Sequence, residues 1–133
     1  MDRSAVDQWL QAYVRAWKSY DPVEIEALFA DNVQYRYHPY DDPVHGRKAV
    51  VATWLGEGDK DAASSRDEPD TYDASYHAIA VDGDVAVATG TTWYRATPGG
   101  IVDKEFDNCF VMRFDGDGRC TEFTEWFMQR PSA

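Results

Sequence analysis

The sequence predicts an α+β domain in which three N-terminal helices pack on one face of a strongly bent, mostly antiparallel sheet. Two observations predict this class. Apolar residues recur at helical spacing in the first part of the chain, and from residue 72 onward strand-like segments follow one another across short turns. With 133 residues the chain has the size of one domain, so we expect residues 1–133 to form a single unit.

The helices are expected where capping signals precede apolar periodicity. Residues 4–7 form a plausible capping box at the start of a first helix over about 5–19. Asp21 followed by Pro22 starts a second helix, which is expected to stop near Asp31. A short third helix is expected from Arg47 to just before Gly56.

Alternating apolar residues predict the strands. Residues 33–37 alternate strictly and are expected to form the first strand. Residues 57–70 are charged and poor in apolar side chains, which is typical of an exposed loop. Glycine-containing turns separate four later strands, at about 72–81, 85–96, 101–114 and 119–128.

The last two strands each carry one polar exception on an apolar face. Asn108 interrupts one face and Glu125 interrupts the other. If Asp115 and Gly118 flank a two-residue turn, Asn108 lies directly opposite Glu125. A carboxylate on an apolar face is costly unless it is paired, hydrogen-bonded or protonated, so we expect burial to raise the pKa of Glu125. Glu125 is then either a general acid or base, or a carboxylate that ties down a neighbouring group.

The charge balance excludes several partners. Thirteen basic and twenty-four acidic residues give a net charge of −11 and a pI near 4.5, which argues against nucleic acid and anionic membrane surfaces. The sequence has no apolar run long enough to cross a bilayer and no secretion signal at its start, so a cytoplasmic location is expected.

No metal or cofactor is expected from the residue spacing. Cys109 and Cys120 lie in no metal or redox motif and are expected to be free thiols. His38, His45 and His77 lack the close spacing of metal ligands.

The other face of the last strand points to a homodimer. Trp126 and Met128 fall on this face near the strand end, where they could form an exposed apolar patch across a two-fold axis. The alternative is a monomer that covers both side chains with its terminal tail.

Four segments of the chain can be compared with known families: residues 13–31, residues 35–39, Gly46-Arg47-Lys48-Ala49-Val50 and Asp115-Gly116-Asp117-Gly118-Arg119. Together they resemble the SnoaL-like group of the nuclear transport factor 2-like superfamily. The resemblance covers nearly the whole chain and implies a cone-shaped α+β barrel, with the helices closing a curved sheet around a pocket. This fold includes ketosteroid isomerases, polyketide cyclases, epoxide hydrolases, dehydratases and binding proteins, so it does not decide the function.

The ketosteroid isomerase pattern matches this chain in part. Tyr13 falls where these isomerases have a hydroxyl donor to the substrate oxygen, and their general base falls on His38 or Tyr37. Their acidic oxyanion donor aligns with Phe110, which donates no hydrogen bond and so argues against that mechanism. Glu125 lies close to the position where the polyketide cyclases of the group keep an aspartate.

These observations predict a pocket for a small apolar or aromatic molecule. Its polar end is expected at Glu125 and Asn108, with His38 or Tyr13 as further catalytic candidates. The predicted substrate-binding side chains are Trp17, Tyr35, Tyr37, Trp54, Phe110, Phe123 and Phe127. An enzyme with this pocket would be an isomerase, cyclase or dehydratase that needs no cofactor, in which Glu125 moves a proton and Asn108 or Tyr13 binds the developing oxyanion. The alternative is a non-catalytic protein for small-molecule binding or dimerisation.

Overall fold

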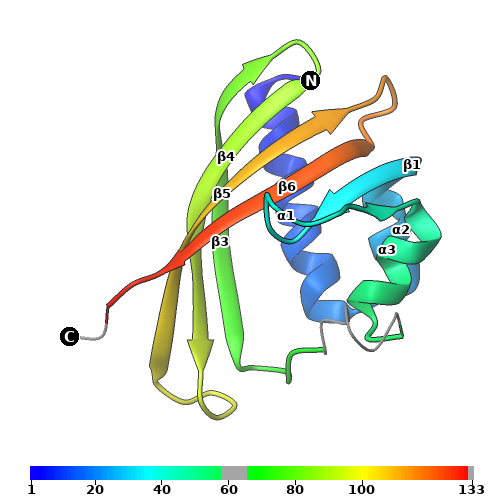
Figure 1. The fold of residues 1–133 in the computed structure, drawn as a ribbon. Coiled ribbons are helices and arrows are strands. Elements are labelled where there is room, and N and C mark those ends of the chain that lie inside the picture. The colour runs from blue at the N-terminus through cyan, green and yellow to red at the C-terminus, as the bar shows by residue number, and fades with distance from the viewer. Residues whose placement is uncertain (58–65, 132–133) are drawn as a thin grey trace.

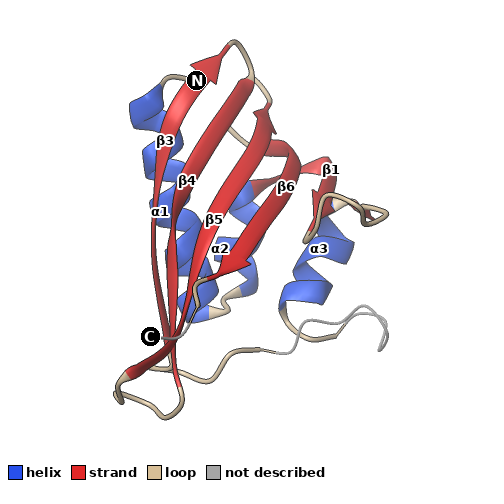
Figure 2. Cartoon of the chain, turned by 60° about the vertical axis from the view of Figure 1, so that its left-hand side comes forward, coloured by secondary structure: helices blue, strands red, loops and turns tan. Residues whose placement is uncertain are grey.

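A computed structural model describes residues 1–57 and 66–131 and confirms the predicted α+β class. Three helices, α1 (Arg3–Ser19), α2 (Pro22–Leu28) and α3 (Arg47–Trp54), cover one face of a six-stranded sheet (Figures 1 and 2). The strands are β1 (Phe29–Arg36), β2 (Val44–His45), β3 (Tyr72–Asp82), β4 (Val85–Arg95), β5 (Val102–Phe114) and β6 (Cys120–Gln129). None of the helices in the described part of the chain is long and apolar enough to cross a membrane.

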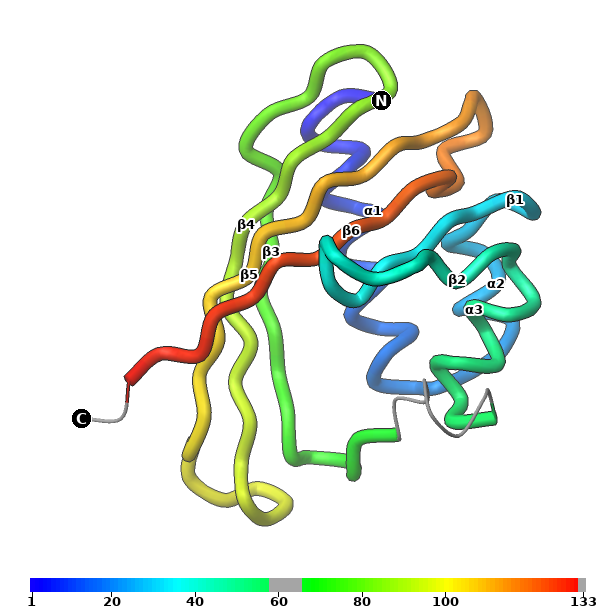
Figure 3. Tube along the Cα trace, in the orientation of Figure 1, coloured from blue at the N-terminus to red at the C-terminus, as the bar shows by residue number. Residues whose placement is uncertain are grey.

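The sheet is bent around the helices and is not closed. Its strand order is β2-β1-β6-β5-β4-β3, and every pair is antiparallel except β1 and β6, which are parallel. Figure 3 shows the long strands β3, β4 and β5 bending along their length, with α1 on one side. This curvature is consistent with the predicted cone shape, and it leaves a space between helices and sheet that side chains fill.

The helix ends follow local hydrogen bonding. The cap of α1 is Asp2 rather than a capping box at Ser4, because the Asp2 side chain accepts a bond from the Ala5 N–H at 2.8 Å. The expected second helix was too long: α2 ends at Leu28, and β1 begins at Phe29. Phe29 pairs with β6 there, so sheet pairing overrides the helical pattern.

The predicted register of the last hairpin was wrong by two residues. Phe110 pairs with Glu125, and Asn108 pairs with Phe127. The turn is wider than expected because the Asp115 side chain accepts bonds from the N–H groups of residues 117 and 119, and a bulge leaves one extra residue, Thr121, on β6. A shift of two residues preserves the face, so Asn108 and Glu125 remain diagonal neighbours on the inner side.

Aromatic rings dominate the core between the helices and the sheet. Phe29, Phe110 and Phe123 are fully buried, and the Tyr35 and Phe123 rings stack with their centroids 4.5 Å apart. Burial of each phenylalanine ring stabilises the fold by about 2–3 kcal/mol. Phe110 and Phe123 therefore belong to the core, not to the wall of the pocket described below, where the sequence analysis expected them.

The segment predicted as an exposed loop lies largely outside the described residues. Residues 58–65 are not described, whereas residues 66–70 lead into β3 without regular secondary structure. Most of this short stretch is exposed, but Asp67 is partly buried. Its contacts make it part of the site.

Candidate functional site

An aromatic pocket of about 230 Å3 lies between the helices and the inner face of the sheet. Ten of its fourteen lining residues are aromatic. The lining consists of Tyr13, Trp17, Tyr20, Tyr35, Tyr37, Trp54, Asp67, Tyr76, Thr92, Tyr94, Phe106, Asn108, Glu125 and Phe127. Eight of these were named from the sequence: Tyr13, Trp17, Tyr35, Tyr37, Trp54, Asn108, Glu125 and Phe127.

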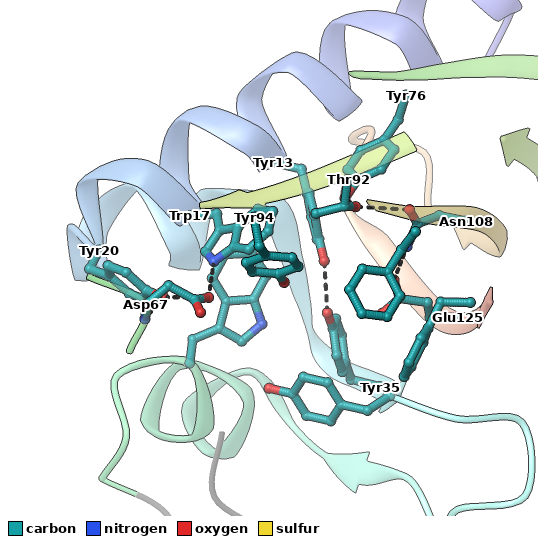
Figure 4. Close-up of a pocket in the computed structure, with 14 residues that line it drawn as sticks. Tyr13, Trp17, Tyr20, Tyr35, Asp67, Tyr76, Thr92, Tyr94, Asn108 and Glu125 are labelled. Carbon is teal, nitrogen blue, oxygen red and sulfur yellow. Dashed lines mark hydrogen bonds between the residues drawn. The ribbon is translucent and has the colours of Figure 1, made fainter. Parts of the chain in front are cut away.

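A chain of hydrogen bonds runs across the sheet to Glu125 (Figure 4). The Tyr76 and Thr92 hydroxyl oxygens are 2.6 Å apart, and the Thr92 hydroxyl donates to Asn108 Oδ1 at 2.8 Å. Asn108 Nδ2 then donates to Glu125 Oε2 at 2.9 Å. Because Thr92 uses its hydrogen on Asn108, Tyr76 must donate to Thr92. Every bond of the chain therefore points toward the carboxylate.

The strands that carry this chain need a glycine opposite Tyr76. Gly90 on β4 pairs with Tyr76 on β3. A Cβ atom at Gly90 would collide with the Ser75 carbonyl oxygen and the Tyr76 ring. The absence of a side chain at Gly90 thus lets the two strands approach closely and keeps the Tyr76 hydroxyl within reach of Thr92.

Glu125 is a carboxyl with an altered acidity. Burial raises its pKa from 4.5 to about 7, while the Asn108 hydrogen bond and the nearby His38 act in the opposite direction. A carboxyl with this pKa is present in both protonation states near neutral pH. It can therefore either take up or release a proton during a reaction.

Two tyrosine hydroxyls meet elsewhere on the pocket wall. The hydroxyl oxygens of Tyr13 and Tyr35 are 3.0 Å apart, and both side chains are buried. Burial raises the pKa of each well above the usual value, and the charge of Glu125 raises both further. Both hydroxyls thus stay protonated. The one that accepts the shared bond keeps its own hydrogen for another partner, such as a substrate oxygen.

A second carboxylate, Asp67, lines the pocket beside Trp17 and Tyr20. Trp17 Nε1 donates to Asp67 Oδ2 at 3.0 Å, and the Tyr20 hydroxyl lies 3.5 Å from the same oxygen. The Asp67 N–H donates to the Tyr20 hydroxyl oxygen at 2.8 Å. Burial raises the pKa of Asp67, and the bonds from Trp17 and Tyr20 oppose that rise.

Asp67 and part of the pocket wall on β3 and β4 were not predicted from the sequence. Asp67 sits in an irregular segment whose composition gives no sign of an inward contact. Thr92 and Tyr94 could have been found, since they are two residues apart on one strand and therefore share a face. Tyr76 could have been found in the same way from the alternation of β3.

His38 lies outside the pocket, on the other side of Glu125. Its Nδ1 is 2.9 Å from Asp41 Oδ2, and its ring lies 5.3 Å from the Phe127 ring. His38, Phe127 and Glu125 border a shallow outer groove. Of the two residues aligned with the isomerase base, Tyr37 lines the pocket and His38 does not.

The described residues offer no ligand set for a metal ion or a phosphate group. Within residues 1–57 and 66–131, no group of three or more histidine, cysteine or acidic side chains is placed to hold a metal ion. Among the described residues, the pocket lining contains no lysine, arginine or histidine that would pair with a phosphate group.

Three helices packed on a bent six-stranded sheet, with a pocket between them, define a nuclear transport factor 2-like fold. The chain belongs to the SnoaL-like domain family, whose model matches residues 10–123. Its structure is similar to the crystal structure of a candidate ketosteroid isomerase from Kribbella flavida DSM 17836, with a TM-score of 0.65 and 15% sequence identity. That match covers 99% of this chain and 84% of the other, and at this identity it concerns the fold alone. A comparison with curated proteins finds no match.

Proposed function

We propose that the protein is a cofactor-independent enzyme that moves a proton beside a carbonyl group of a small, apolar or aromatic molecule. Isomerisation, cyclisation and dehydration are the reactions that such a transfer allows. The observation that carries this proposal is Glu125, a pocket carboxyl whose pKa is raised to about 7 and which a directed hydrogen-bond chain holds in place. Its similarity in position to the acid of the polyketide cyclases supports the same role.

Each polar group of the pocket has a distinct role in this reaction. The Glu125 carboxylate takes a proton from the carbon next to the carbonyl, and the electron pair of that bond moves to the carbonyl oxygen. The hydroxyl pair of Tyr13 and Tyr35 donates to the oxygen as its charge develops. Glu125 then returns the proton to the product. Asn108 positions Glu125, because its amide is already bonded to Thr92 and to Glu125 Oε2.

His38 acts through Glu125 in this proposal. It stands outside the pocket, and its proximity favours the ionised carboxylate. His38 is therefore a positioning residue that adjusts the acidity of Glu125, whereas Tyr37 contributes to the binding wall.

The pocket wall favours a compact substrate with aromatic or apolar character. Drug-sized ligands usually occupy roughly 300–1,000 Å3. The cavity of about 230 Å3 is smaller and suits a molecule of about one or two rings. Flat rings of this kind would pack against Trp17, Trp54 and Phe127.

Proton exchange tests the proposal without knowledge of the natural substrate. Phenylacetone and 2-tetralone are incubated with the protein in D2O, and loss of their α-hydrogen signals is followed by 1H NMR. We expect the wild-type protein to accelerate exchange and Glu125→Gln to abolish the acceleration while remaining folded. Glu122→Gln is the matched control, because Glu122 lies on the same strand, is half exposed and pairs with Arg113 at 3.1 Å.

Two results would contradict the enzyme proposal. Equal exchange by the wild type and Glu125→Gln would exclude Glu125 as the proton carrier. Binding of both ketones without any exchange would favour the alternative, a binding protein in which Glu125 and Asn108 only anchor the ligand.

We further propose that two copies associate through the outer face of β6. Trp126 and Met128 point away from the pocket, and 43% and 75% of their surfaces are exposed. Such large apolar side chains are commonly covered by a second subunit. Light scattering of the wild type and Trp126→Lys tests this: we expect a dimer that dissociates in the variant, and a monomeric wild type would contradict it.

A further inference from the structure

The charged side chains that line the pocket, among the described residues, are all acidic. Among residues 1–57 and 66–131, its lining contains two carboxylates, Asp67 and Glu125, and no basic side chain. Neither carboxylate forms an ion pair with a residue in the described part of the chain. In Figure 4 they lie at opposite ends of the pocket, with aromatic rings between them. A ligand that brought a negative charge into this space would meet repulsion at either end.

Hydrogen bonds from Trp17 and Tyr20 hold the Asp67 carboxylate through only one of its two oxygens. The Trp17 indole and the Tyr20 hydroxyl both approach Oδ2, and no described residue donates a hydrogen bond to Oδ1. The guanidinium of Arg66, the preceding residue, lies 5.4 Å from the centroid of the Tyr20 ring, and Arg66 Nε donates to the Leu55 carbonyl. Within the part of the chain that the structure describes, this end of the pocket is thus an oriented acceptor without an ion-pair partner.

The rings around Asp67 add to the attraction for a cation. Trp17, Tyr20 and Tyr94 line the same end, and the Trp17 and Tyr94 rings are 6.3 Å apart in an edge arrangement. The faces of tryptophan and tyrosine carry negative charge density, and such rings around a carboxylate are typical of sites for ammonium groups. A neutral apolar molecule would gain from contact with the rings but would form no ion pair with the carboxylate.

We propose that the substrate of this pocket carries a protonated amine, which pairs with Asp67 while the reacting carbon lies at Glu125. The position of the reacting carbon at Glu125 rests on the proposed function, whereas the pairing of the amine with Asp67 does not. The ligand class it names is a small aryl-alkyl amine, as opposed to a neutral alcohol or ketone or a carboxylic acid.

Three probes that differ only in their polar end test the inference. They are 3-phenylpropylamine, 3-phenylpropanol and 3-phenylpropanoate, and their dissociation constants are measured by isothermal titration calorimetry at pH 8. At this pH the amine is still protonated. We expect the amine to bind about tenfold more tightly than the alcohol, and the carboxylate to bind most weakly.

Two variants assign the preference to Asp67. Asp67→Asn keeps the shape and an oxygen acceptor for Trp17, and we expect it to weaken amine binding about fivefold to tenfold while leaving alcohol binding nearly unchanged. Asp82→Asn is the matched control, since it removes the same charge from an exposed position at the end of β3. It should leave all three constants as in the wild type.

Each contrary result has a defined meaning. Alcohol binding as tight as amine binding, an unchanged amine constant in Asp67→Asn, or no amine binding at millimolar concentration would overturn the inference. These readouts are independent of turnover. A protein that prefers the amine yet exchanges no ketone hydrogens would overturn only the proposed function, and one that exchanges them without preferring the amine would overturn only this inference.

Discussion

The two carboxylates lie at opposite ends of one pocket and differ in what surrounds them. Glu125 comes from a central strand, and its neighbours are strand residues whose positions the sheet register determines. Asp67 comes from an irregular segment and is held by Trp17 and Tyr20 at the end of α1. Burial raises the pKa of both: it brings the pKa of Glu125 to about 7, and at Asp67 the bonds from Trp17 and Tyr20 oppose the rise.

This difference separates proton transfer from charge recognition. At neutral pH, Glu125 exists in both protonation states and can pass a proton. Asp67 receives bonds from an indole N–H and a hydroxyl, which favour its ionised form. One pocket therefore contains a group suited to chemistry and another suited to binding a positive charge.

The largest expected effect is on stability at the Glu125 end. The raised pKa means that Glu125 binds its proton more tightly in the folded state than in the unfolded state. The contribution of this proton to the free energy of unfolding is therefore fully present below about pH 4.5 and is lost as the pH rises through about 7. Glu125→Gln mimics the protonated form and should be up to about 3 kcal/mol more stable than the wild type at pH 8, with no difference below pH 4.5. Urea unfolding across this pH range checks the prediction, and a constant difference at every pH would contradict it.

Removal of one oxyanion donor should slow the reaction. We expect Tyr13→Phe to slow ketone hydrogen exchange about 100-fold, because the hydroxyl pair loses a member. The measurement is the initial exchange rate with saturating 2-tetralone. Tyr40→Phe serves as the control, since Tyr40 is 81% exposed. A rate in Tyr13→Phe equal to that of the control would remove the hydroxyl pair from the mechanism.

At the Asp67 end of the pocket, removal of the Trp17 indole should lower the free energy of unfolding through the loss of a hydrogen bond to the carboxylate. Trp17→Phe removes the indole donor to Asp67 Oδ2, and we expect a loss of about 1–2 kcal/mol at pH 7. Because the lost bond favours the ionised form, the loss should shrink as acid protonates Asp67. Thermal unfolding at several pH values measures it, and a loss that grows in acid would show that Asp67 is not the group affected.

The smallest effect is expected from the outer groove. His38→Gln keeps a hydrogen-bond donor for Asp41 and removes the influence that lowers the pKa of Glu125, so this pKa should rise slightly. The pH dependence of ketone exchange provides the measurement. A downward shift would mean that His38 acts in another way.

Strand alternation explains why one end of the pocket could be predicted from sequence. Asn108 and Glu125 stand out because each is polar within a run of apolar residues of period two. The turn around Asp115 was misjudged by two residues, which changes the partners but preserves the face. The face of each side chain was therefore more predictable than its exact neighbour.

Contacts without periodicity could not be predicted. Asp67 reaches Trp17 across 50 positions of sequence, and no local pattern marks such a contact. Phe110 and Phe123 point inward like the pocket residues, but they are buried so deeply that they belong to the core and not to the pocket wall. Depth depends on the bend of the sheet, and alternation carries no information about it.

The most direct test of the central claim is a 13C NMR titration of the glutamate carboxyls, with Glu125→Gln used to assign the resonance of Glu125. It needs neither a substrate nor an assumption about the reaction. We expect one glutamate that titrates near pH 7 and whose signal is missing in the variant. A Glu125 resonance that titrates near 4.5, like an exposed glutamate, would contradict the assignment of Glu125 as the proton carrier of this pocket.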